Sequence, residues 1–210
     1  MTAPDRVTFF HSPNTRSSGV LALLEELQAD YELRVLNMKA GENRRAEYLA
    51  VNPMGKVPAI RHRGALVTEQ AAVYMYLAEL YADRGLAPLP GDPLRGPYLR
   101  WMVFYGSSFE PAVVDRAMKR EPPPPSMSPY GDYDTVLDTL EKQLGQGPFM
   151  LGERFTAADM LWGSALGWTI GFKVVPERPV FMAYVERVNE RPSLNRARAR
   201  DAELAAAQAG

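Results

Sequence analysis

Apolar positions in the first part of the chain alternate between a strand period and a helix period. Val7 to Phe10 is a short β-branched and aromatic run, which is typical of a strand. From Val20 to Leu27 apolar residues recur at helical spacing, with Glu25 and Glu26 facing outward. Tyr31 to Leu36 alternates weakly and predicts a second strand. A strand, a helix and a strand of these lengths form a βαβ unit, which favours a parallel pair.

The following stretch predicts a hairpin and then a helix. Val57–Ile60 and Leu66–Val67 are strand-like and flank the turn residues 62–64. Glu69 to Asp83 places its apolar residues on one helical face, and Gly85 can end that helix. The order βαβ followed by ββα is that of a thioredoxin-like domain.

A proline-rich connection at residues 86–93 marks a domain boundary. Beyond it the pattern carries no strand signal and is helical throughout. We therefore predict an α+β, thioredoxin-like domain over residues 1–84 and an all-α domain over residues 91–210.

Two features of the predicted helical domain concern folding. Thr156 and Asp159 form a capping box at a helix start, so we expect Asp159 to act in folding and not in catalysis. Gly163, Gly167 and Gly171 recur every fourth residue, which allows a neighbouring helix to pack closely.

Two other segments differ in composition from the helices beside them. Residues 122–125 are four consecutive prolines, which predict a stiff surface loop or, alternatively, a ligand for a partner protein. Residues 201–208 are polar and alanine-rich, and we expect them to fray.

The amino-acid composition argues against several classes of function. The 210 residues carry a net charge of −1, which gives no indication of nucleic acid or of an anionic membrane as a partner. The absence of cysteine excludes disulfides, thiolate metal sites and redox chemistry by protein thiols. His11 and His62 are the only histidines, so we expect no metal site. Without a signal-peptide pattern or a run of about 20 apolar residues, we expect a cytoplasmic protein.

The stretch from Asn52 to Ile60 combines turn and strand signals. Pro53 and Gly55 favour a turn, and Pro58 cannot donate a hydrogen bond within a sheet. A cis bond before Pro58 would direct the amide and carbonyl of Val57 outward, where they could pair with an extended peptide.

The segment Thr68-Glu69-Gln70 opens the next helix, whose unpaired amides suit a carboxylate. The same residues are also compatible with an ordinary hairpin followed by a capped helix.

Asn-Pro-Met-Gly-Lys-Val-Pro-Ala-Ile, followed by Thr-Glu-Gln before a helix, resembles the glutathione-binding signature of the cytosolic glutathione S-transferases. The resemblance implies that the residue before Pro58, Val57, pairs with the cysteinyl backbone of glutathione. It also implies that Glu69 and Gln70 hold the γ-glutamyl end. The family usually has Ser where this chain has Gln70, which keeps a donor and an acceptor but changes their reach.

The turn after the first strand carries the candidate catalytic residues. Arg16-Ser17-Ser18 resembles the Ser-type members of the family, which implies that the Ser17 hydroxyl stabilises the glutathione thiolate. Thr15 and Asn14 are rivals, because some bacterial classes use Thr or Asn from this loop. A further alternative is that Ser17 or Thr15 only caps the helix.

The resemblance also implies positions for the rest of the ligand. Asn43 and Arg44 occupy places where some classes hold the glycine carboxylate of glutathione, and Lys56 is a second candidate for that carboxylate. Tyr105 and Phe109 fall near the pocket for an apolar second substrate.

The function implied is transfer of glutathione, the co-substrate, to a small apolar electrophile by a homodimeric enzyme that uses no metal. A glutathione-dependent peroxidase or disulfide reductase, and a maleylacetoacetate-type isomerase, are the enzymatic alternatives. A non-catalytic interaction protein of the same fold is the alternative from another class.

Overall fold

The computed structural model describes residues 6–121 and 123–208, and its contacts divide the chain into two compact units. The first unit runs through Arg84 and resumes at Pro192, and the second comprises Gly85–Arg191. The first unit breaks at Arg84, the last residue of the predicted first domain, and residues 192–208 belong to this unit and not to the helical one.

A four-stranded mixed sheet forms the centre of the first unit, in the order β2-β1-β3-β4. β1 is parallel to β2 and antiparallel to β3, and β3 is antiparallel to β4. The predicted βαβ and ββα order is confirmed. The elements are β1 (Val7–His11), α1 (Ser17–Leu27), β2 (Tyr31–Val35), a 3₁₀ turn (Glu42–Arg44), α2 (Ala46–Leu49), β3 (Ala59–His62), β4 (Ala65–Val67), α3 (Gln70–Leu80), a second 3₁₀ turn (Ala82–Arg84) and α9 (Pro192–Ala207).

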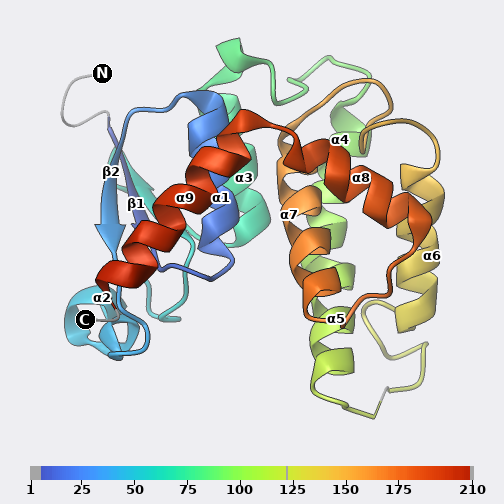
Figure 1. Ribbon diagram of the computed structural model, residues 1–210, viewed down its shortest axis with the longest axis horizontal. Helices are drawn as coiled ribbons and strands as arrows, with labels where there is room; N and C mark the ends of the chain where they lie inside the picture. The colour runs from blue at the N-terminus through green and yellow to red at the C-terminus, as the bar shows by residue number, and fades with distance from the viewer. Residues whose placement is uncertain (1–5, 122, 209–210) are drawn as a thin grey trace. The chain divides into compact units, whose positions relative to one another are not determined.

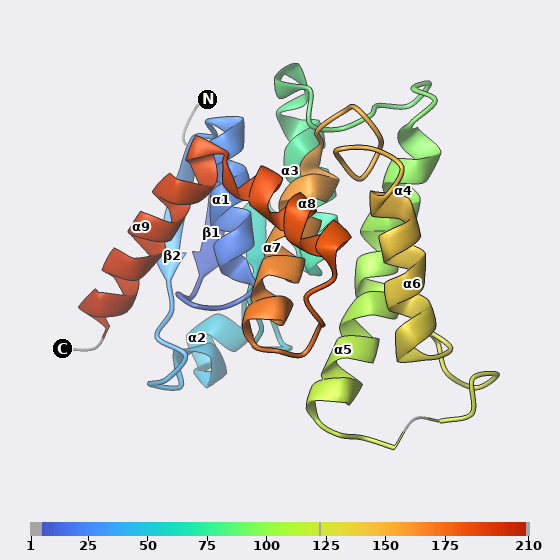
Figure 2. The ribbon, with the colours of Figure 1, turned by 45° about the vertical axis from the view of Figure 1, so that its right-hand side comes forward.

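Helix α9 follows the second unit in the sequence but belongs to the first, where it packs along α1 (Figures 1 and 2). Arg196 Nε lies 3.1 Å from the Glu25 carboxylate, and Ser193 donates a hydrogen bond to Glu26. The helix continues through Ala207, and Asp201 within it is buried. The expectation that residues 201–208 fray is therefore wrong, because a polar side chain of this segment has its partners inside the unit.

The second unit is helical among its described residues, apart from two isolated β-bridges at residues 149–154. Trp162 lies at its centre, with ring centroids 5.0 Å from Phe109 and 5.7 Å from Tyr105. Its elements are α4 (Arg95–Phe104), a π-helical turn (Tyr105–Phe109), α5 (Glu110–Ala117), α6 (Tyr133–Leu144), α7 (Ala157–Gly171) and α8 (Pro179–Asn189).

The predicted capping box is present at the start of α7. Asp159 is fully buried and accepts hydrogen bonds from the Thr156 amide at 2.8 Å and the Tyr184 hydroxyl at 2.8 Å. Gly163 of α7 faces Val188 of α8 so closely that a side chain would collide with it. Both features support helix packing, as the sequence predicted.

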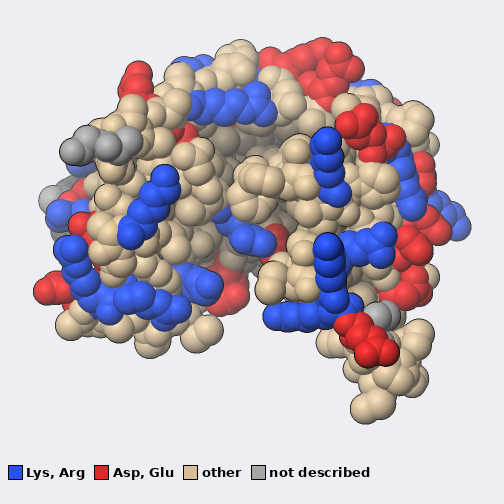
Figure 3. All heavy atoms as spheres, turned by 60° about the horizontal axis from the view of Figure 1, so that its bottom comes forward, with Lys and Arg blue, Asp and Glu red and all other residues tan. Residues whose placement is uncertain are grey.

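Residues 123–125 of the four-proline run have no helix or strand, and Pro122 lies outside the described residues. Figure 3 shows Lys and Arg side chains and Asp and Glu side chains on the same face of the molecule, in keeping with the net charge near zero.

Candidate active site

The topology of the first unit brings three loops together at one end of its sheet. Register pairs Phe10 with Ala59 and Ile60 with Val67, so the end of β1, the start of β3 and the end of β4 are neighbours. The arrows of β1 and β2 in Figure 1 point toward this end. The residues here that carry candidate chemistry are Asn14, Thr15, Val57, Glu69 and Gln70, and we call them the sheet-end site.

Ser17, the predicted thiolate contact, has no exposed surface. Its hydroxyl lies 2.8 Å from His11 Nδ1 and accepts a hydrogen bond from the Ser12 amide at 3.1 Å. The direct contact with a thiol predicted for Ser17 does not fit this structure, because protein atoms surround the hydroxyl on all sides.

Thr15 and Asn14 are the more accessible residues of the same loop. The Thr15 side chain is half-buried, and its hydroxyl lies 2.7 Å from that of Ser17. Asn14 is exposed, has a positive φ of 57°, and donates its backbone amide to Asp201 at 3.0 Å. Of the three predicted candidates, Thr15 and Asn14 are therefore the ones that a bound molecule can reach.

The loop before β3 holds the peptide of Val57 in place. The Lys56 carbonyl accepts hydrogen bonds from the Tyr48 hydroxyl at 2.6 Å and from the Asn52 side chain at 2.9 Å. Burial raises the pKa of Tyr48 to about 12, so its hydroxyl stays protonated and donates. The Val57–Pro58 bond is cis.

The backbone of Val57 makes no hydrogen bond with any of the residues that the structure describes. A half-buried amide and carbonyl without partners are unusual in a folded chain, since such groups are nearly always paired. Val57 thus offers a donor and an acceptor to an external peptide backbone.

Helix α3 begins at Gln70, directly after Glu69. Glu69 is exposed and has a positive φ of 61°, a conformation that costs a non-glycine residue of order 1–3 kcal/mol and concentrates at functional sites. Gln70 Nε2 donates to the Arg16 carbonyl at 3.4 Å, which joins the helix start to the loop of Thr15. The amides of the first turn carry partial positive charge.

The residues predicted to hold the glycine carboxylate have separate roles. Asn43 is buried and its amide donates to the Gly55 carbonyl at 2.9 Å, so it braces the loop and is not available to a ligand. Gly55 has a φ of 61° and no room for a Cβ, which would lie 2.7 Å from the Asn43 carbonyl oxygen. Arg44 and Lys56 are exposed and remain candidates.

Tyr105 and Phe109 are only 3% and 0% exposed and lie in the core of the second unit against Trp162. Their side chains are buried in the core of that unit, and their contact with a second substrate remains a prediction. The exposed side of their π-helical turn consists of small residues, Gly106 and Ser107.

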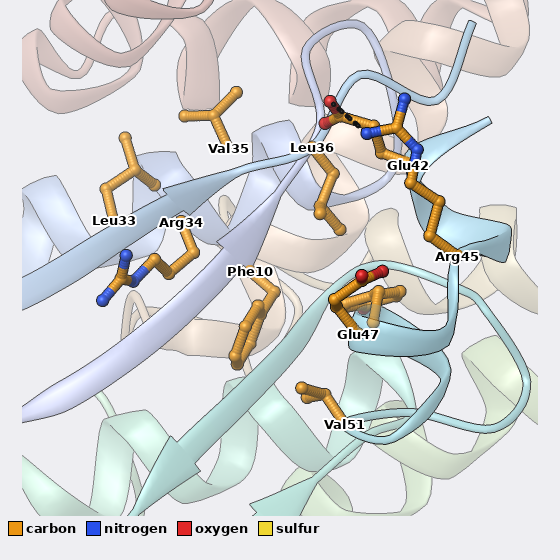
Figure 4. Close-up of a pocket in the computed structure, with 10 residues that line it drawn as sticks. Phe10, Leu33, Arg34, Val35, Leu36, Glu42, Arg45, Glu47 and Val51 are labelled. Atoms are coloured by element: carbon orange, nitrogen blue, oxygen red, sulfur yellow. Dashed lines mark hydrogen bonds and ion pairs between the residues drawn. The ribbon is translucent and has the colours of Figure 1, made fainter. Parts of the chain in front are cut away.

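A groove of about 470 Å³ lies elsewhere on the first unit, between the sheet and α2. Figure 4 shows Phe10 and Val51 beside it and the Glu42–Arg45 ion pair at its rim. The groove contains none of the residues of the sheet-end site, and we assign no ligand to it.

Sequence reasoning missed His11 and Asp201, which are in contact beneath the loop of Thr15 at 2.9 Å. Nothing in the spacing of two residues 190 positions apart could have linked them, although a histidine at the end of a buried strand was a signal for His11. The described residues contain no group of three or more His, Cys, Asp or Glu arranged to hold a metal ion. None of their helices combines the length and apolar character that crossing a membrane needs.

A four-stranded α/β unit whose Val57 peptide is free, followed in sequence by a helical unit, is the architecture that the sequence resemblance implies for the glutathione S-transferases. The family models agree with this class: residues 6–79 match the glutathione S-transferase N-terminal domain and residues 130–187 match the C-terminal domain. The chain belongs to the cytosolic glutathione S-transferase superfamily.

Two curated relatives come from plants. The chain is 31% identical over 157 residues to the glutathione S-transferase APIC of Nicotiana tabacum, covering 70% of this chain and 74% of that protein. It is 29% identical over 192 residues to a glutathione S-transferase of Hyoscyamus muticus, covering 85% and 90% respectively.

Two bacterial structures are similar over nearly the whole chain. A glutathione transferase from Methylococcus capsulatus is 28% identical with a TM-score of 0.79, covering 94% of this chain and 99% of that one. A sphingomonad glutathione S-transferase complexed with glutathione is 27% identical with a TM-score of 0.76, covering 93% and 98%.

Proposed function

We propose that this protein is a glutathione S-transferase that binds reduced glutathione at the sheet-end site and activates its thiol for attack on an electrophile. The observation that carries the proposal is the unpaired peptide of Val57 beside a polar loop and a helix start. A tripeptide with a carboxylate at each end and a central thiol has groups that match all three.

The cysteinyl backbone of glutathione would pair with the amide and carbonyl of Val57, as an added strand pairs with a sheet edge. The γ-glutamyl carboxylate would lie at the first amides of α3, and its ammonium group would face the Glu69 carboxylate. Arg44 or Lys56 would take the glycine carboxylate, since both cations are exposed in the loops beside Val57.

This placement brings the thiol to the loop of Asn14 and Thr15. A free thiol has a pKa near 8.5, and a hydroxyl that donates to sulfur favours the thiolate, which is the nucleophile. We assign this contact to Thr15, because its hydroxyl is accessible and Ser17 is not. Asn14 is the alternative donor.

The attacking thiolate would displace a leaving group from, or add to, a small apolar electrophile. By analogy with the family we further propose a homodimer that acts in the cytoplasm in detoxification. The exposed Met54 on the loop before Val57 is a surface that a second subunit could cover.

Calorimetric titration with reduced glutathione tests the binding mode. We expect saturable binding by the wild-type protein and at least tenfold weaker binding by Glu69→Gln, which keeps the shape and removes the charge. Glu47→Gln is the matched control, since Glu47 is exposed and outside the site. Equal affinities for the two variants would contradict the role of Glu69.

Conjugation assays with an aryl halide then test the chemistry. Thr15→Val should lower turnover by about 10²-fold, in the range of removing one donor to a reacting centre, whereas Thr15→Ser should retain most of it. Full activity of Thr15→Val would move the assignment to Asn14. A wild-type protein that binds no glutathione would refute the proposed function.

A further inference from the structure

Four polar side chains form a continuous chain from the interior of the first unit to the sheet-end site. Asp201 Oδ1 lies 2.9 Å from His11 Nε2, His11 Nδ1 lies 2.8 Å from Ser17 Oγ, and Ser17 Oγ lies 2.7 Å from Thr15 Oγ1. His11 and Ser17 are fully buried, and Thr15 is the member that reaches the surface. The buried pair of His11 and Asp201 is thus connected to the Thr15 hydroxyl, which we propose contacts the thiol of glutathione.

The contact with Asp201 indicates which ring nitrogen of His11 carries a proton. Burial alone would raise the pKa of Asp201, but the adjacent His11 ring and the hydrogen bonds from the Asn14 amide and the Ser18 hydroxyl outweigh it and lower that pKa. A carboxylate oxygen and a bare imine nitrogen would repel each other at 2.9 Å, so the proton is assigned to Nε2.

In a neutral His11 with its proton on Nε2, Nδ1 is an acceptor. Ser17 can then donate to Nδ1, and its oxygen is left to accept from the Ser12 amide and the Thr15 hydroxyl. The Ser12 carbonyl is a competing acceptor for both hydroxyl protons, at 2.7 Å from Thr15 and 3.1 Å from Ser17. When Ser17 donates to His11 Nδ1 and Thr15 donates to Ser17, the protons of both hydroxyls point along the chain toward His11.

We propose that His11, held by Asp201, receives the proton of the glutathione thiol through Thr15 and Ser17. This inference rests on the proposed function. The S–H bond breaks as its proton passes to Thr15 Oγ1, the Thr15 proton passes to Ser17 Oγ, and the Ser17 proton passes to His11 Nδ1. The electron pair stays on sulfur, both hydroxyls remain neutral, and the positive imidazolium is balanced by the Asp201 carboxylate.

Thr15 is then the catalytic residue that touches the sulfur, and Ser17, His11 and Asp201 are positioning residues that act through it. After the three proton transfers, Thr15 carries the proton that came from sulfur and donates a hydrogen bond to the thiolate. The chain that removes the proton therefore also stabilises the thiolate. Once the sulfur has formed its bond to the electrophile, the proton returns along the chain to solvent.

Other ionisable groups on the elements around His11 are engaged with one another. On α9 and α1, Arg196 and Arg200 lie 3.1 Å and 3.9 Å from the Glu25 carboxylate. On β2, Tyr31 accepts a hydrogen bond from Arg200 at 3.0 Å, and Arg34 pairs with Glu32. Asp201 is a charged group that directly contacts the His11 ring, at 2.9 Å from Nε2.

Two measurements on glutathione-bound protein test the relay. The ultraviolet absorbance of the thiolate against pH gives the apparent pKa of the bound thiol. Calorimetry in buffers of different ionisation enthalpy gives the number of protons released on binding. In the wild-type protein we expect the thiolate to form with no proton released, because His11 retains it.

Ser17→Ala interrupts the relay and leaves Thr15 in place. We expect its bound thiol pKa to rise by at least one unit, and each thiolate that still forms to release one proton. Asp201→Asn should raise the thiol pKa in the same way. Glu26→Gln is the control for loosening α9, because Glu26 bonds Ser193 and is outside the chain of four.

If Ser17 and Asp201 had only a structural role, replacing them would change glutathione affinity and thermal stability but not the number of protons released per thiolate. Release of one proton per thiolate by the wild-type protein, or wild-type titration curves for both Ser17→Ala and Asp201→Asn, would overturn the relay while leaving the transferase intact. Failure of the wild-type protein to bind glutathione at all would instead overturn the proposed function and the relay with it.

Discussion

Replacing Gly163 by alanine should destabilise the helical unit, although alanine is the better helix former. Gly163 is in the interior of α7, where a Cβ would lie 2.5 Å from one γ-carbon of Val188 and 2.8 Å from its Cβ. Val188 is fully buried on α8 and cannot turn into solvent. Helix α7 or α8 must therefore shift to admit a single methyl group.

Two opposing contributions determine the size of the effect. Overpacking of a buried contact costs about 1–3 kcal/mol, while exchanging glycine for alanine inside a helix gains about 1 kcal/mol. We expect a net loss of about 1–2 kcal/mol in the free energy of unfolding. Gly167→Ala should gain up to about 1 kcal/mol, because its Cβ would meet Val185 at an ordinary 3.4 Å.

Gly171 completes a matched series on one helix. It is the last residue of α7, and a Cβ there would meet no atom within 4 Å, so Gly171→Ala should be neutral or slightly stabilising. Urea unfolding followed by circular dichroism gives the three free energies, provided that the slope of each transition is unchanged. Equal stabilities of the Gly163 and Gly167 variants would refute the argument from close packing.

A double-mutant cycle identifies the colliding partner. Val188→Ala removes two buried methyl groups and should cost about 2 kcal/mol. In the Gly163→Ala background the loss should be smaller by about 1–2 kcal/mol, because the new methyl group occupies part of the space. Strict additivity of the two substitutions would show that the strain lies elsewhere.

Three further predictions concern buried polar groups. Asp159→Ala leaves two backbone amides and the Tyr184 hydroxyl without their acceptor and should cost about 3–5 kcal/mol, measured by urea unfolding; a loss below about 1 kcal/mol would contradict it. Asp201→Asn should lower stability at neutral pH. Because folding lowers the pKa of Asp201, its contribution is complete above the unfolded value near 3.9 and disappears as the pH falls through the folded value. Thermal melts from pH 7 downward should converge with wild type in strong acid, and a constant difference would exclude an electrostatic origin. Tyr48→Phe removes one of two hydrogen bonds to the Lys56 carbonyl and should weaken glutathione binding about three- to tenfold by calorimetry; unchanged affinity would show that Asn52 suffices.

The fold was predictable because its signals are local. The strand Val7–His11 alternates buried and half-buried residues, and Val20 to Leu27 supplies a buried apolar face, so short windows carry the information. The capping box at Thr156 needs only four consecutive residues to be recognised. Such patterns are visible without knowing any tertiary contact.

The candidate site was predictable only where the backbone supplies the chemistry. Val57 and Glu69 follow from a turn motif and a helix start, and the structure places both at one end of the sheet. The burial of Ser17 could not be predicted, because a hydroxyl at a helix start can face solvent or the interior, and its partners His11 and Ser12 cannot be inferred from spacing. Burial of Tyr105 and Phe109 likewise depends on Trp162, more than fifty residues away.

Helix α9 shows why the end of a chain can be misjudged most easily. Its charged and polar residues predict a solvated segment, although Leu194 and Ala197 are buried in the first unit. Paired polar groups add to this burial: Arg196 with Glu25, and Asp201 with His11 and Ser18. A buried carboxylate stabilises only when its donors are already in place, so Asp201 and the loop it binds must be ordered together. The order of the sheet-end loop therefore depends on a residue near the end of the chain, and changes in α9 should alter thiol chemistry before they alter the sheet.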